Sequence, residues 1–148
     1  MGAGQQSRVD CVKLAGRKVA TWYLRQHPKV QGLLFLPSVK KQDRINARVR
    51  YIEGDLTPIE RTRWLKNFAS EPPELSETEK TKWLASLQDA AISSDAFFPF
   101  RDSLDHASRV GVKYVAQAGG SIADQEVISA ANEYGMTMFF TGLRLFHH

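Results

Sequence analysis

The chain has 148 residues, a formal net charge of +4, one cysteine and 43% hydrophobic residues. This length suits one domain, or a large piece of one, with a sizeable core, and no apolar run approaches the roughly 20 residues of a membrane span. A lone Cys11 excludes an internal disulfide and favours a reducing compartment, the cytosol, while the modest, interspersed charge favours a mixed solvated surface over a nucleic-acid or membrane surface.

The first third of the chain predicts two helices. Apolar residues at near-helical spacing indicate a helix over 7–26 that ends before Pro28. Its expected apolar face consists of Cys11, Ala15, Val19, Trp22 and Tyr23. An apolar run over 33–36 stops at Pro37. The basic segment 40–50 then predicts an amphipathic helix, broken at Gly54, whose apolar stripe is Ile45, Val49 and Ile52.

Two further helices carry explicit start signals. Thr57 and Glu60 form one capping-box pattern, and Ser76 and Glu79 form a second. We therefore expect 38–88 to be a helical segment, an insertion or lid on a sheet domain.

Residues 89–148 alternate between short apolar runs and helical patterns. The runs 90–93, 112–116 and 136–140 predict strands, with one helix over about 101–109 between them. The second helix is expected to be capped by Ser121, with Asp124 at the capping-box position and Gly135 just past its end. Its expected apolar face is Ala123, Val127, Ala131 and Tyr134. A β-α-β-α-β order implies right-handed crossovers and a parallel sheet. The predicted fold class is α/β.

A polar or glycine-rich segment follows each predicted strand: 94–102, 117–121 and 141–148. The carboxyl ends of parallel strands are where ligands bind, so these segments indicate a ligand site. At 119–121, unsatisfied N–H groups before a helix would suit an anion, but a plain turn capped by Ser121 explains the same residues equally well.

Other candidate residues also have two interpretations. Asp95 and Asp102 can hold a metal or a ligand amine, or can be a loop residue and a first-turn acid. Phe97 and its neighbouring aromatics can stack on a heterocycle or belong to the core. Arg144 can bind phosphate or carboxylate, or be a surface charge. No zinc site is predicted at the terminal pair His147–His148, because no Cys, Asp or Glu is spaced to complete one.

The segment 94–102 and the tail 143–148 closely resemble the C-terminus of the AICAR transformylase/IMP cyclohydrolase family, and residues 2–8 with 14–16 match the same family further upstream. The likeness spans essentially the whole chain, and the segment over 55–88 is similar to the eukaryotic form. It implies that 1–148 is the C-terminal portion of a transformylase domain, with a cytidine-deaminase-like three-layer fold in which 89–148 is the parallel α/β unit.

The resemblance also implies an activity and a set of residues. The family transfers a formyl group from 10-formyltetrahydrofolate to AICAR in de novo purine biosynthesis, as a cytosolic homodimer with composite sites. Matched by motif, the AICAR contacts would be Arg8, Phe97 and Arg144; the folate contacts would be Val9, Asn46, Asp102, Ser121 and Ile122. Asp95 would lie where the family holds a structural potassium ion.

Two departures from the family pattern bear on function. Ala118 stands where many members have proline, and no Lys-His dipeptide, the family's catalytic pair, occurs in the chain. We therefore expect an isolated chain to be inactive and to act with the remainder of a longer enzyme or as a homodimer. The alternative is a non-catalytic truncated paralogue that binds or modulates the full-length enzyme. A nucleic-acid binder using the 40–50 helix is the weakest hypothesis, since no nucleic-acid motif accompanies it.

Overall fold

The computed structural model describes residues 1–146, so the terminal histidine pair lies outside the described residues. The chain forms two compact units. Residues 1–19 and 85–146 make an α/β unit, and Ala20–Leu84 make a helical unit. Helix α1 (Arg8–Leu24) begins in the first and ends in the second, close to the bounds predicted for it. The helical unit is therefore inserted, in chain order, into the α/β unit, and the predicted segment 38–88 covers most of it.

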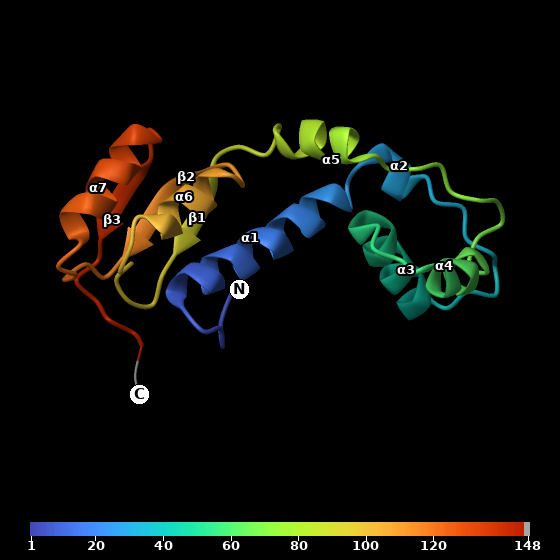
Figure 1. The fold of residues 1–148 in the computed structure, drawn as a ribbon, viewed down its shortest axis with the longest axis horizontal. Coiled ribbons are helices and arrows are strands. Elements are labelled where there is room, and N and C mark those ends of the chain that lie inside the picture. Colours follow the sequence, from blue (N-terminus) through green and yellow to red (C-terminus); the bar gives the residue numbers. More distant parts are fainter. Residues whose placement is uncertain (147–148) are drawn as a thin grey trace. The chain divides into compact units, whose positions relative to one another are not determined.

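The α/β unit is built on a three-stranded parallel sheet (Figure 1). Its strands are β1 (Ala90–Ser93), β2 (Val112–Gln117) and β3 (Thr137–Phe140), in the order β1-β2-β3. Helix α6 (Asp102–Ser108) connects the first two strands, and α7 (Asp124–Glu133) connects the last two. The predicted α/β class, strand positions and parallel pairing are confirmed.

One face of this sheet holds the core of the unit. Val115 of β2 has no exposed surface and packs in one cluster with Leu104 of α6 and Val127 of α7. Two right-handed crossovers that advance in the same direction place both helices on the same face of a sheet. The alternate side chains point to the opposite face, where Tyr114 and Phe139 are 47% and 57% exposed.

The helical unit contains the end of α1 and four further helices. These are α2 (Pro28–Gln31), α3 (Lys41–Glu53), α4 (Pro58–Leu65) and α5 (Glu77–Leu84). Both predicted capping boxes are present: Thr57 and Glu60 exchange hydrogen bonds at the start of α4, and Ser76 and Glu79 do so before α5. Each box satisfies backbone donors that a helix start leaves unpaired.

An aromatic cluster around Trp64 forms the core of the helical unit. Its ring stacks on Tyr51, with 6.0 Å between the ring centroids, and meets Phe68 edge-on at 4.6 Å. Its indole N–H donates to the carbonyl oxygen of Ala47 at 2.9 Å. Of the stripe predicted for α3, only Ile52 is buried. The indole approaches α3 at the small Ala47, so the buried stripe is shifted around the helix toward Ala47 and Tyr51.

Two other predicted helix faces were partly wrong. The buried residues of α1 are Val12 and Leu24, while Trp22 is exposed. The two ends of α1 belong to different units, so no single stripe is buried along its length. On α7, Ala130 is buried in place of Tyr134, whose hydroxyl donates to Asp105 Oδ1 at 2.9 Å. A tyrosine at the edge of a core commonly keeps its hydroxyl paired in this way.

Candidate functional site

The segments that follow the three strands lie side by side at one edge of the sheet. The amide of Ser94 donates to Ala116 O at 2.9 Å, and the amide of Thr141 donates to Gln117 O at 2.8 Å. The convergence predicted from the sequence is therefore confirmed, and it forms what we call the strand-end site: residues 94–102, 117–124 and 141–146, together with Arg8.

Arg8, the first residue of α1, contacts the segments at this edge through its side chain. Its Nη1 donates to Ser94 Oγ at 3.1 Å and to Asp95 Oδ1 at 2.9 Å. Its guanidinium lies over the ring of Phe146, 4.9 Å from the centroid. The amides of Leu145 and Phe146 donate to the carbonyl oxygen of Asp95 at 2.8 and 3.1 Å. Three segments far apart in sequence thus meet around one arginine.

The aromatic residues after β1 divide between core and surface. Phe98 is buried in the core cluster, as the structural interpretation of the aromatics predicts. Phe97 is half-buried and Phe100 is exposed, so both reach the surface of the site. Asp102 is exposed in the first turn of α6, where its charge complements the helix dipole. Two aromatic side chains and a carboxylate therefore remain accessible to solvent in this segment.

The backbone N–H groups of the glycine-rich turn after β2 donate to a side chain of the next helix. The amides of Gly120 and Ser121 donate to the two oxygens of Asp124, at 2.7 and 3.1 Å. These donors are occupied, so the structure supports the turn and contradicts an anion site on these two amides. Ser121 was predicted to cap the helix; instead α7 begins at Asp124, and Ser121 Oγ accepts from the amide of Ala123. Asp124 therefore accepts amides of the turn before α7, and its bond from the Ser121 amide is the one that its capping-box position predicts.

Gly119 holds this turn in a conformation that other residues would find strained. Its φ is +75°, and a Cβ there would lie 2.4 Å from Cδ1 of Phe140. The glycine is therefore needed for the close approach of the turn to β3.

The remaining predicted site residues fall into three positions. Val9 is half-buried next to Arg8 on α1. Arg144 and Ile122 are exposed, and Arg144 makes no ion pair within residues 1–146. Asn46 belongs to the helical unit, on α3. The structure thus brings together the segments that contain the predicted AICAR residues, all within the α/β unit.

An ionic network fixes the two helices that lie behind the site. Arg101 pairs with Asp105 at 3.2 Å and with Glu133 at 2.7 Å. Hydrogen bonds from Arg101 hold the pKa of Glu133 below its usual value. Burial raises the pKa of Asp105, but hydrogen bonds from Arg101 and Tyr134 outweigh it and the net shift is downward. Both carboxylates stay ionised, and the network ties α6 to α7.

The surroundings of Asp95 do not fit the potassium ion that the resemblance implies. One carboxylate oxygen already faces the Arg8 guanidinium, and the backbone carbonyl accepts two amides. A positive charge 2.9 Å away repels a second cation at that oxygen. We assign no step to such an ion.

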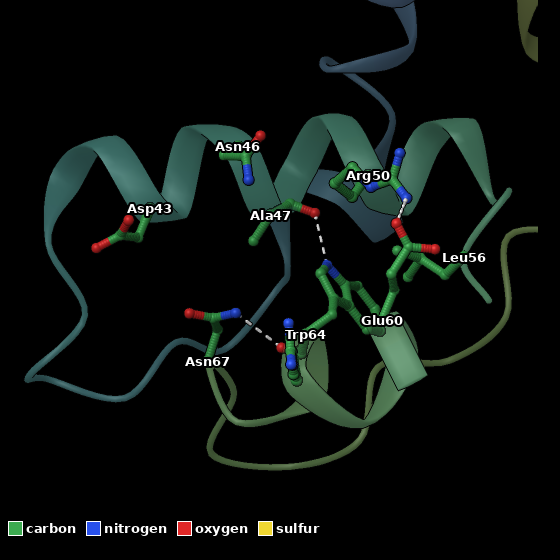
Figure 2. A pocket seen from close by; sticks show the side chains of 9 residues that line it. Asp43, Asn46, Ala47, Arg50, Leu56, Glu60, Trp64 and Asn67 are labelled. Carbon is green, nitrogen blue, oxygen red and sulfur yellow. Dashed lines mark hydrogen bonds and ion pairs between the residues drawn. The ribbon is translucent and has the colours of Figure 1, made fainter. Parts of the chain in front are cut away.

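The helical unit has a cavity of about 250 Å³ between α3 and α4. Figure 2 shows Asn46 and Ala47 on α3 facing the segment that bears Trp64 and Asn67. The full lining is Asp43, Asn46, Ala47, Arg50, Leu56, Glu60, Arg63, Trp64 and Asn67. Arg50 is paired with Glu60 at 3.2 Å, which neutralises one wall. Asn46, predicted to contact folate, therefore lines a mostly polar cavity to which Trp64 also contributes.

No protein-family model matches the chain. Within residues 1–146, no helix is long and apolar enough to span a membrane.

The residue at this edge that sequence reasoning did not single out is Gln117. Its side chain is fully buried, and its Oε1 accepts the amide of Phe98 at 2.8 Å. The only signal in the sequence is a polar residue that ends an apolar run, which equally marks the end of any strand.

Proposed function

We propose that the chain is the C-terminal part of an AICAR formyltransferase, which uses 10-formyltetrahydrofolate as its formyl donor in purine biosynthesis. The observation that carries the proposal is the meeting of Arg8, the segment 94–97 and the tail 141–146 at one edge of a parallel sheet. These are the segments on which the family resemblance depends. The segments that contain Arg8, Phe97 and Arg144 therefore lie at the same edge.

Each of these groups suits one part of AICAR. The Arg144 guanidinium is exposed and unpaired within the described chain, so its planar fork is available for the ribose phosphate. Phe97 offers a half-buried ring beside the imidazole carboxamide. Arg8 uses Nη1 for Ser94 and Asp95, which holds the guanidinium in place while its remaining N–H groups stay available.

The folate side of the proposal rests on the family resemblance and on residues around the same edge. Val9, Asp102, Ser121 and Ile122 would line the folate pocket next to AICAR. Asn46, which the resemblance also assigns to folate, belongs to the helical unit and remains a prediction of the resemblance alone. Formyl transfer also needs a base to take the proton of the AICAR amine. The family's Lys-His pair does not occur in this sequence, so the chain supplies binding residues and another segment supplies the base.

One face of the parallel sheet is exposed, which supports the proposal that further protein packs against it. Parallel sheets are almost always covered on both faces, yet within the α/β unit Tyr114 and Phe139 stand exposed on one of them. We infer that the remainder of the transformylase, in the same chain or in a full-length partner that a truncated paralogue would bind, covers this face. Recovery of the chain with full-length enzyme would support this inference, and a chain that stays a lone monomer when mixed with full-length enzyme would contradict it.

The proposal is tested by AICAR binding to the chain and to Arg144→Ala. Removing a charge-assisted hydrogen bond to phosphate should weaken AICAR affinity by about tenfold to a hundredfold. Arg109→Ala is the matched control, because Arg109 is an exposed arginine of the same unit outside the strand-end site. Equal AICAR affinity of Arg144→Ala and Arg109→Ala, or no binding by the unmodified chain at millimolar AICAR, would overturn it.

A further inference from the structure

Gln117 is the last residue of β2, and both ends of its side-chain amide are paired inside the protein. Its Oε1 accepts the Phe98 amide at 2.8 Å, and its Nε2 lies 3.2 Å from Sδ of Met138. A backbone N–H can only donate, so the side-chain oxygen must be the atom that faces Phe98. The side chain has no exposed surface. Buried amides of this kind are kept only where their hydrogen bonds are made.

The same residue also holds the segment that follows β3. Its carbonyl oxygen accepts the Thr141 amide at 2.8 Å and the Thr141 hydroxyl at 3.2 Å. Gln117 is thus bonded to the loop after β1, to β3 and to the start of the tail. Its neighbours Ala116 and Ala118 have no polar side chain with which to replace it.

We propose that Gln117 is a positioning residue of the strand-end site. By fixing the Phe98 amide, its side chain sets where the adjacent Phe97 ring stands. The bonds to Thr141 come from its backbone carbonyl, so they remain when the side chain is substituted. It touches no ligand itself, because its side chain is wholly buried. The inference rests on the proposed function only in naming AICAR as the ligand that the positioned residues bind.

Two substitutions separate the hydrogen bond from the bulk of the side chain. Gln117→Leu is similar in size but leaves the Phe98 amide buried without an acceptor. Gln117→Glu keeps an acceptor oxygen and, when protonated, stays neutral like the amide. Burial disfavours a charged carboxylate and raises its pKa. The Glu variant should therefore match the unmodified chain at acidic pH and lose stability as pH rises through that raised pKa.

The first readout needs no ligand: the exchange rate of the Phe98 amide hydrogen, measured by NMR. In Gln117→Leu this amide should exchange about tenfold to a hundredfold faster, while the Val115 amide in the middle of β2 keeps its protection. Gln117→Glu at acidic pH should retain the protection of Phe98. Gln125→Leu, an exposed glutamine on α7, is the matched control and should change neither amide.

The second readout is AICAR affinity of the same variants at the same pH. Gln117→Leu should bind about tenfold more weakly or worse, whereas Gln117→Glu should be rescued at acidic pH and weaken as pH rises. If Gln117→Leu does not fold, this pH dependence of Gln117→Glu decides the matter.

Unchanged Phe98 exchange or unchanged AICAR affinity in Gln117→Leu would overturn the inference. If the unmodified chain binds no AICAR, the proposed function fails, and the exchange data still decide whether Gln117 fixes the Phe97–Phe98 segment.

Discussion

Each of the two units is stabilised internally, and the contacts inside the helical unit differ in kind from those inside the α/β unit. In the helical unit, the helix starts are fixed by bonds between residues three apart, such as Thr57 with Glu60, around one aromatic cluster. In the α/β unit, the strand-end site depends on residues far apart in sequence, such as Arg8 with Asp95, which are 87 positions apart. The site therefore requires the complete unit to be folded, whereas local sequence already specifies the helix starts.

The largest expected effect comes from removing the centre of the helical unit. Trp64→Ala should lower the free energy of unfolding by about 3–5 kcal/mol, because it leaves a cavity between Tyr51 and Phe68 and removes the indole hydrogen bond to the Ala47 carbonyl. Trp22→Ala is the control: Trp22 is exposed, and its removal should cost about 0.5 kcal/mol. Urea unfolding followed by circular dichroism measures both. Equal losses would contradict the assignment of Trp64 as the core.

A smaller effect is expected for the ion pair between Arg8 and Asp95, which connects distant parts of the chain within the α/β unit. A double-mutant cycle of Arg8→Ala and Asp95→Asn should give a coupling energy of about 1 kcal/mol, reduced from a buried pair because Asp95 is half exposed. The local pair Lys13–Asp10 on the same helix is exposed at both ends, so its coupling should be weaker than that of Arg8 with Asp95. A larger coupling for the local pair would reverse the comparison between near and distant contacts.

The smallest expected effect is the pH dependence of a helix start. Hydrogen bonds from Lys29 and then from Ser76 lower the pKa of Glu79 from 4.5 to about 2. Because the folded pKa is depressed, its stabilisation is present above about 4.5 and is lost as pH falls toward about 2. The urea midpoint of the unmodified chain should therefore fall more steeply over this window than that of Glu79→Gln. Parallel slopes would show that the Glu79 carboxylate adds nothing to folding.

The features that the sequence predicted correctly are those that depend on residues close together in the chain. Both capping boxes, the three strands and the parallel α/β order followed from residues close together in the chain. The stripes of α1, α3 and α7 were partly misplaced, because the partner that packs against a helix, such as Trp64 against Ala47, is set by tertiary structure.

The position of the strand-end site in the fold was predictable from the sequence, but most of the contacts within it were not. The parallel order places the segments after the strands at one edge, and the capping-box spacing of Ser121 and Asp124 predicts the bond from the Ser121 amide. No local pattern shows that Asp124 also accepts the amide of Gly120. The bond from Phe98 to Gln117 is likewise invisible to periodicity, since a glutamine at a strand end has no preferred partner until the loop folds over it.

The measurement that tests the central claim most directly is an NMR titration of the chain with AICAR, following the backbone amides of both units. The account predicts that the largest shifts occur at Arg8, Phe97 and residues 141–146, while the amides around Trp64 stay in place. An absence of shifts at millimolar AICAR, or shifts confined to the α3–α4 cavity, would contradict it.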